Sequence, residues 1–217
     1  MIRRRIMGGI RYIAPGYIAL EYVESLPDSK GTGKSYTRTS VQLNCLDNFD
    51  IDYQVYGHEG SFFGTGGYYL VQLAQDTSGS NTYNGGLRLK IYTDVRYYYP
   101  ITSEQRESRH LITKRGSILY FDNEAAITDL PLINQNSSQP FSICTARHST
   151  NDDGGVYRPS GKYYRFTIYN LNTSVVKNDF RPALRESDGV AGWYDLVDQQ
   201  FYTSYSSTPY TAGPYLK

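Results

Sequence analysis

The sequence is poor in the residues that most often carry chemistry. Its 217 residues include two cysteines, three histidines and one tryptophan. Cys45 and Cys144 match no zinc or redox spacing, so we expect two small buried side chains; a single disulfide is the alternative, unusual for a chain made in the cytosol. His58, His110 and His148 form none of the short pairs that bind a metal, and His110, inside a strand pattern, is expected to be structural.

Two further absences narrow the class of protein. The 22 Lys and Arg nearly cancel the 21 Asp and Glu, which disfavours a uniformly basic nucleic-acid-binding protein and an acidic tail. With this charge balance we expect no specific nucleic-acid partner. No apolar run approaches the roughly 18 residues that a membrane span needs, so we also expect no membrane partner. The first arginines are followed by Gly8, Gly9, Arg11 and Pro15 rather than by an apolar stretch, so we predict no secretion signal.

The N-terminus is strongly basic for its length. Residues 1–11 contain Arg3, Arg4, Arg5 and Arg11 and no acid; the whole chain is at +1 and this segment at +4, so residues 12–217 are at −3. We predict that residues 1–11 form a basic arm that anchors the protein on an acidic partner surface, and that residues 12–217 form one domain. A frayed, solvated end is the alternative.

Alternation of apolar and polar residues predicts an all-β protein. Segments 49–56, 87–92 and 163–169 carry an apolar or aromatic residue at every second position, as half-buried strands do. Their apolar faces are Phe49, Ile51, Tyr53 and Val55; Leu87, Leu89 and Ile91; and Tyr164, Phe166 and Ile168, with Tyr163 opposite. Shorter candidates are 17–23, 40–46, 68–74, 109–114, 117–122, 141–146, 193–197 and 200–204. Helical turns are expected only at 103–108 or 124–128, so many short strands joined by turns favour a β-sandwich or jelly roll.

Tyrosine is unusually abundant, with 23 residues. Tyr97, Tyr98 and Tyr99 are consecutive. Exposed tyrosines offer flat contact area, little side-chain entropy to lose, and a hydrogen-bonding tip. We therefore predict that these three residues contact a protein partner or a glycan. The alternative is that they are core residues, since about half of the tyrosines on alternating strands should point inward.

Two segments resemble a known family. Residues 15–25, PGYIALEYVES, resemble the LEYIES-type opening of concanavalin A-like (laminin-G-like) modules that occur in virion proteins of tailed phages. Residues 164–213 resemble the closing pattern of that family, DFxP…SDGvvGLYDL…FYT. Between them, Arg109–Ile112 with Phe121–Asp122 resembles the strand pair with an RH…vDG pattern. The sequence departs from the family at 24–31 and at Asn172-Thr173, where the family has Asn-Gly.

The resemblance implies a concanavalin A-like two-sheet jelly roll and a non-enzymatic structural role in a bacteriophage virion. The arm would fasten the domain to capsid or tail subunits. A head-surface position, as a decoration or head-fibre protein, and a tail-associated position both stay open. A virion protein would be made in the host cytoplasm, and a homo-oligomer, dimer or trimer, is the plain expectation. The alternative function is a glycan-binding module for receptor recognition or adhesion to host surface glycans.

The closing motif also has a physical interpretation. Asp188-Gly189 indicates a turn between strands, and Gly192 indicates a close approach of the backbone to a bulky neighbour. Trp193 then begins a strand pattern, and Asp195 can hold a neighbouring loop through bonds from its side chain to the backbone. We predict that these residues define the fold rather than bind a ligand.

No catalytic arrangement is encoded locally. Glucan-cleaving enzymes of this kind of fold carry a Glu-x-Asp-x-Glu strand, which is absent. The pair Glu21 and Glu24 is three residues apart, which places the two carboxylates on opposite faces of a strand. There is no GxSxG elbow, and Gly31–Ser35 lacks the earlier glycine of a phosphate-binding loop. A Ser/His/Asp triad that meets only in space stays open, but we expect no enzyme and no cofactor.

Calcium is the one cofactor alternative. Asp47, Asp50, Asp52 and the pair Asp152-Asp153 are hard oxygen donors, and laminin-G-like modules sometimes hold Ca²⁺ at a loop edge. Asp50 and Asp52 would share a strand face, but the remaining ligands of a cage are not identifiable. Solvated strand and loop acids are the plainer interpretation.

Overall fold

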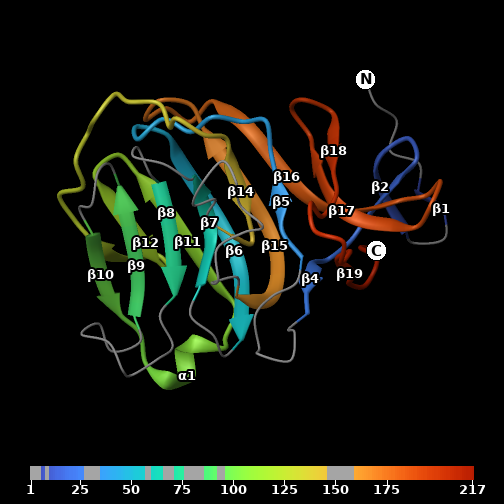
Figure 1. Ribbon diagram of the computed structural model, residues 1–217, viewed down its shortest axis with the longest axis horizontal. Helices are drawn as coiled ribbons and strands as arrows, with labels where there is room; N and C mark the ends of the chain where they lie inside the picture. The colour runs from blue at the N-terminus through green and yellow to red at the C-terminus, as the bar shows by residue number, and fades with distance from the viewer. Residues whose placement is uncertain are drawn as a thin grey trace.

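Two antiparallel sheets lie face to face around an apolar core (Figure 1). The computed structural model describes residues 6–7, 10–26, 35–56, 60–65, 71–75, 86–91, 96–145 and 159–217. The large sheet runs in the order β1 (Ile6–Met7), β2 (Ile10–Ala14), β3 (Tyr17–Ala19), β16 (Val176–Arg185), β15 (Ser160–Tyr169), β6 (Asn48–Tyr56), β11 (His110–Arg115), β12 (Ile118–Phe121) and β13 (Glu124–Ile127). Attached to this path are β4 (Val23–Ser25), β17 (Val190–Asp195), β18 (Gln200–Tyr202) and β19 (Thr211–Ala212). The smaller sheet runs in the order β10 (Arg96–Pro100), β9 (Gly86–Ile91), β8 (Val71–Gln75), β7 (Gly60–Thr65), β14 (Phe141–Ile143) and β5 (Thr37–Arg38).

The core between the sheets is aromatic. The predicted apolar face of β6 is at most 1% exposed at all four positions. Phe63 of the smaller sheet lies at the centre, with its ring centroid 5.3 Å from Phe49, 5.3 Å from Phe141 and 5.7 Å from Phe166. Offset and tilted ring pairs at these distances add to the burial of apolar area. The alternation in the sequence thus sets which face of the large sheet is buried.

The predicted helical turns have different outcomes. Segment 103–108 contains α1 (Ser103–Arg106), which Thr102 and Gln105 close with reciprocal side-chain bonds in a capping box. The prediction of a helical turn at 124–128 was wrong, because this segment contains β13, which pairs with β12. The turn between these strands is Asp122-Asn123, with φ of 50° and 71°, and this backbone conformation favours a tight hairpin. The described residues include no other helix, and none is long and apolar enough to cross a membrane.

The strand predictions hold for most segments, with three corrections. Segment 40–46 contains no strand, but an isolated bridge joins Asn44 to Asn136. Alternation did not identify several elements that are strands: β1, β2, β5, β7, β10, β16 and β19. The segment 17–23 is divided between β3 and β4, which pair with different neighbours, β16 and β15.

A β-bulge reverses the faces predicted for two tyrosines. The register of β15 against β6 shifts between Tyr163 and Arg165, so one extra residue interrupts the alternation. Tyr163 is therefore fully buried beside Phe166, with the ring centroids 6.3 Å apart, and Tyr164 lies half-buried on the opposite face. The prediction that Tyr164 shares the apolar face was wrong for this reason.

The boundary predicted between arm and domain falls inside a strand. β1 pairs with β2, and β2 pairs with β3, so these strands extend the large sheet at one end. Arg11 lies on β2 opposite Ile6. Arg3, Arg4 and Arg5 lie outside the described residues. Figure 1 shows β1 and β2 at the same end of the molecule as β17 and β19.

Candidate functional site

The predicted contact residues Tyr97, Tyr98 and Tyr99 lie on β10, the terminal strand of the smaller sheet. All three are half-buried, and Tyr97 and Tyr99 pack against the core. The ring of Tyr99 has its centroid 5.6 Å from that of Phe121. Contact with a partner or glycan at this strand stays a prediction, and the packing shows that Tyr97 and Tyr99 also support the fold.

Both cysteines are buried thiols, and no disulfide joins Cys45 to Cys144. Burial raises the pKa of the Cys144 thiol well above its usual range. A thiol with a raised pKa stays protonated near neutral pH, and the protonated thiol is a poor nucleophile. The interpretation of the two cysteines as small core residues is confirmed.

His110 is buried and holds three elements together, as expected for a structural histidine. Its Nδ1 lies 2.7 Å from Oδ2 of Asp122, and its Nε2 contacts the carbonyl oxygen of Gln105 in α1. The other oxygen of Asp122 accepts the backbone N–H of Leu111 at 2.9 Å. The imidazole thereby ties α1 and the β12–β13 turn to β11. His58 and His148 lie outside the described residues.

We expect His110→Phe to lower the free energy of unfolding by about 2 kcal/mol, because it keeps a ring in the core but loses two polar contacts, one of them to a carboxylate. Leu111→Phe is the matched control. Leu111 is the next residue and is exposed, so the same new side chain there should change little. Urea unfolding of the full chain measures both, and equal effects would contradict the role assigned to His110.

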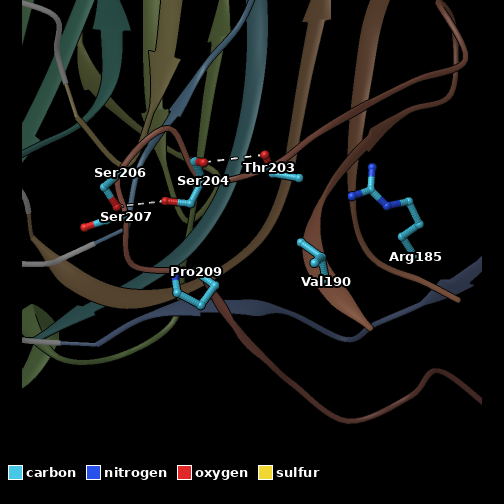
Figure 2. Close-up of a pocket in the computed structure, with 7 residues that line it drawn as sticks. All are labelled: Arg185, Val190, Thr203, Ser204, Ser206, Ser207 and Pro209. Atoms are coloured by element: carbon cyan, nitrogen blue, oxygen red, sulfur yellow. Dashed lines mark hydrogen bonds between the residues drawn. The ribbon is translucent and has the colours of Figure 1, made fainter. Parts of the chain in front are cut away.

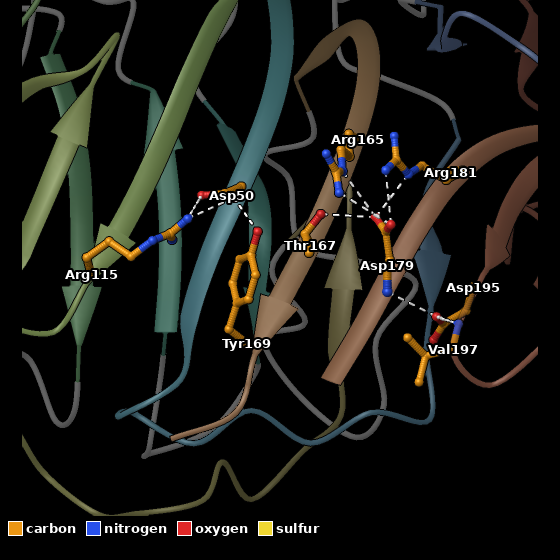
Figure 3. A network of polar contacts seen from close by, with 9 residues as sticks. All are labelled: Asp50, Arg115, Arg165, Thr167, Tyr169, Asp179, Arg181, Asp195 and Val197. Carbon is orange, nitrogen blue, oxygen red and sulfur yellow. Dashed lines mark hydrogen bonds and ion pairs between the residues drawn. The ribbon is translucent and has the colours of Figure 1, made fainter. Parts of the chain in front are cut away.

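The polar side chains of interest gather on the side of the large sheet that faces away from the core. We call this surface the outer face and define it by Asp50, Asp52, Arg109, Thr113, Arg115, Tyr164, Arg165, Thr167, Tyr169, Asp179, Arg181 and Tyr194. Along each strand these residues alternate with residues that point into the core, and across neighbouring strands they pair with one another. Figure 3 shows several of them in two groups of contacts, one around Asp50 and the other around Asp179.

Asp50 and Asp52 lie at the centre of the outer face and are already bound. Asp50 accepts hydrogen bonds from Nη2 of Arg115 at 2.7 and 2.9 Å and from the Tyr169 hydroxyl at 2.7 Å. Asp52 accepts two from Arg109, at 2.8 and 2.7 Å. Burial, with a further contribution from Asp50, raises the pKa of Tyr169. Both carboxylates are therefore occupied by hydrogen bonds from arginine side chains, and Asp50 also by the hydroxyl of Tyr169.

The carboxylates considered for calcium do not form a set of metal ligands in the described part of the chain. Asp47 is buried, and its oxygens accept from Nζ of Lys177 at 2.9 Å and from the backbone N–H groups of Asn44 and Leu171 at 2.9 and 3.0 Å. Among the described residues, no group of three or more His, Cys, Asp or Glu side chains could hold a metal ion. Asp152-Asp153 lies outside the described residues.

One nearly buried carboxylate holds two arginines. Asp179 is 8% exposed, and its Oδ1 accepts from Nε of Arg165 at 3.1 Å and from Nε of Arg181 at 3.0 Å. Its Oδ2 accepts from Nη2 of the same two residues, at 3.3 and 3.0 Å. The Thr167 hydroxyl adds a bond of 3.0 Å. Figure 3 shows both guanidiniums converging on this carboxylate.

The closing motif has the fold-defining role that its residues predict. Asp195 is fully buried, and its Oδ1 accepts the backbone N–H groups of Asp179 and Val197, both at 3.0 Å. Gly189 has φ of +69° in the predicted turn. At Gly192, an added Cβ would lie 2.9 Å from the ring of Phe201, which is the predicted close approach to a bulky neighbour.

Sequence reasoning missed a set of aromatic rings covered by cations. The guanidinium carbon of Arg109 lies 3.7 Å from the ring centroid of Tyr164, and Nζ of Lys162 lies 4.7 Å from that of Tyr22. The two rings meet edge to face at 5.5 Å. Burial raises the pKa of Tyr164, and the nearby Arg109 opposes that rise. No local pattern could reveal this cluster, because only the pairing of β6 with both β11 and β15 brings Arg109 beside Tyr164.

A shallow hollow of about 250 Å³ opens between β16, β17 and the loop that follows β18 (Figure 2). It is lined by Arg185, Val190, Thr203, Ser204, Ser206, Ser207 and Pro209. The hydroxyls of Ser204 and Ser206 lie 2.9 Å apart, and Ser206 donates to the carbonyl of Thr208 at 3.0 Å. These bonds order a rim rich in hydroxyl groups.

The whole arrangement can be compared with solved structures. The native heptameric SAP-like pentraxin from Limulus polyphemus is similar over 90% of this chain and 95% of that chain, with a TM-score of 0.56 and 8% sequence identity. The fold is a concanavalin A-like jelly roll. The predicted fold class is thereby confirmed. No protein-family model and no curated protein sequence matches the chain.

Proposed function

We propose that this chain is a non-enzymatic structural protein of a bacteriophage virion, placed on the head surface or in the tail. The observation that carries the proposal is that the described part of the basic segment, β1 and the start of β2, is paired into the large sheet. Arg11 lies on β2, which is paired into the end of the large sheet, so a partner that binds the arm would be attached to the sheet through the hydrogen bonds of β2. The resemblance of residues 164–213 to phage modules supports the same role.

The experiment is a count of this chain in purified particles of the phage that encodes it, by quantitative mass spectrometry against the major capsid protein. Hundreds of copies would support a position on the head lattice, as decoration or fibre. A few to a few dozen copies would support the tail. Absence from the particles would contradict the virion role altogether.

The arm makes a separate prediction. Replacing Arg3, Arg4 and Arg5 with alanine should reduce incorporation into particles roughly tenfold or more if the three charges hold an acidic partner surface. Replacing the same residues with lysine is the matched control, because it keeps the charge and should keep most of the incorporation. Equal incorporation of the alanine and lysine variants would argue against electrostatic anchoring by residues 1–11.

We also propose a homo-oligomer in the particle. The similar Limulus protein is described as heptameric, and closed symmetric assemblies are common among proteins of one chain type. Light scattering of the purified full chain measures the number of subunits. A monomer at the concentrations found in particles would oppose this part of the proposal.

Glycan binding is the second candidate function. The observation that favours it is the tyrosine and cation cluster on the outer face, since aromatic rings and hydroxyl groups suit sugar rings. Tyr22 and Tyr164 do not belong to the core cluster, and Lys162 and Arg109 cover one face of each ring, so a sugar would meet the rings together with these cations. A glycan array with Tyr164→Ala beside Tyr98→Ala would separate the outer face from the β10 tyrosines, and no binding across a broad panel would count against both.

A further inference from the structure

Positive charge exceeds negative charge at one place on the outer face. Three other arginines in this region pair one to one with carboxylates: Arg109 with Asp52, Arg115 with Asp50, and Arg185 with Asp188. Asp179, by contrast, is shared by Arg165 and Arg181. This trio therefore carries a net charge of +1, on strands in the middle of the sheet.

The two guanidiniums are held in place and keep donors for a ligand. Each uses Nε and Nη2 to bind Asp179, so the carboxylate fixes the planes of both forks and leaves each Nη1 to other partners. The side chains are 37% and 34% exposed. Paired guanidinium groups are well suited to carboxylate and sulfate oxygens. We propose that Arg165 and Arg181 bind the carboxylate or sulfate group of an acidic polysaccharide.

The neighbours of Arg181 fit a sugar chain. Arg181 lies opposite Tyr194 on the adjacent strand, and the ring of Tyr194 has its centroid 4.7 Å from that of Tyr17. Tyr17 lies in turn 5.1 Å from the ring of Phe201. The guanidinium of Arg185 lies over Phe201 at 5.1 Å and also lines the hydroxyl-rich hollow. The Tyr194 ring is only 6% exposed, so Tyr17 and Phe201, both half-buried, carry the aromatic surface from the arginine pair toward the hydroxyl-rich hollow in Figure 2.

The charge distribution favours a polysaccharide over a nucleic acid. Nucleic acids present a contiguous row of phosphates, and proteins that bind them neutralise many of these phosphates with Lys and Arg. Here Arg165, Arg181 and Asp179 together carry a single excess charge, and residues 12–217 carry −3 while the whole chain is at +1. A single site of this kind suits a polymer whose charges are spaced along neutral rings. This inference goes beyond the virion role and does not depend on where the protein lies in the particle.

Calorimetry of the full chain with three polymers tests the proposal: heparin for sulfate, polygalacturonate for carboxylate, and neutral dextran. We expect binding to one or both acidic polymers that weakens as salt is added, and none to dextran. Binding to heparin alone or to polygalacturonate alone supports the proposal and identifies the group. Binding to neither, or equal binding to dextran, would overturn it.

The variants assign the site. Arg165→Gln and Arg181→Gln should each weaken binding roughly tenfold, the loss of one charged hydrogen-bonding pair. Arg109→Gln is the matched control, because Arg109 lies on the same face but is paired one to one with Asp52. Equal weakening by Arg109→Gln would overturn the assignment, and so would a random-sequence DNA that binds as tightly as the polysaccharide. If a glutamine variant melts early, Arg181→Lys replaces it, and unchanged binding by this variant would overturn the role of the fork.

Discussion

Replacing Gly192 with alanine is expected to lower the free energy of unfolding by about 3 kcal/mol, near the upper end for an overpacked site. The new Cβ would lie 2.3 Å from the carbonyl oxygen of Tyr202. That oxygen belongs to the backbone of β18, which pairs with β17 at Trp193 and Tyr202, so the two strands must separate for the methyl group to fit. Urea unfolding followed by the fluorescence of Trp193, which is the single tryptophan and is fully buried, measures the loss.

Gly189→Ala is the matched control for this prediction. Gly189 has φ of +69° and no atom within 4 Å of an added Cβ, so alanine there meets only backbone strain. We expect a cost of about 1 kcal/mol. If the two variants lose equal stability, conformational freedom rather than the contact with Tyr202 explains the glycine at 192.

Lys114 is expected to make a contribution to the stability of the protein that rises with pH. This side chain is fully buried on the core-facing side of β11, and its Nζ donates to the carbonyl oxygen of Asp47 at 3.0 Å. Burial lowers the pKa of Lys114 from 10.5 to about 8, although the nearby Asp47 opposes the change. Below about pH 8 the amine is charged in both the folded and the unfolded chain, so the cost of burying this charge lowers the free energy of unfolding in full.

Between about pH 8 and 10.5, the unfolded chain binds more protons at Lys114 than the folded chain does. Lys114 therefore contributes an increase in the free energy of unfolding with pH in that window, by about 3 kcal/mol over its full width. Groups whose pKa is raised on folding, such as Cys144 and Tyr169, act in the opposite direction, so the contribution is measured as the difference between the natural chain and a variant without the lysine. Lys114→Met, which has a similar length and no charge, should remove this increase and should be more stable than the natural chain near neutral pH by about 1 kcal/mol or more. Urea unfolding at a series of pH values compares the two chains.

Lys177→Met serves as the contrast for Lys114→Met. Lys177 is partly exposed and pairs with the buried carboxylate of Asp47 at 2.9 Å. Removal of this lysine leaves a buried acid without its cation, so the variant should lose stability near neutral pH. A pH dependence in Lys114→Met as steep as in the natural chain would show that another group causes it.

Local pattern and tertiary pairing contributed differently to what the sequence could predict. Alternation found β6 because this strand is paired on both sides, by β11 and β15, so the same face is buried along its whole length. The same rule failed at Tyr163 and Tyr164, where one extra residue changes the face. A bulge has no local signature in a run of aromatic residues, and nothing in 163–169 indicates where it falls.

The candidate site shows the same division more strongly. The closing motif could be interpreted residue by residue, because Gly192 meets β18, the next strand along the chain, and Asp195 holds the backbone of Val197 two residues on. The arginine pair could not, because neither Arg165 nor Arg181 is distinctive until β15 and β16 lie side by side around Asp179. A site on the exposed side of a sheet is therefore formed by residues from distant segments, none of which has a sequence pattern that indicates a site.

The pairing of early strands with late ones has a consequence for synthesis on the ribosome. β3 joins the sheet through β16, β4 lies between β15 and β19, and β6 meets β15. Loops of more than a hundred residues must close before these contacts form, and such topologies fold slowly. The growing chain thus cannot complete its large sheet until its C-terminal segment emerges. The closing motif then acts as the last component to dock, and chains cut short before β15 would expose the unpaired edges of β3, β4 and β6, the kind of edge from which aggregation begins.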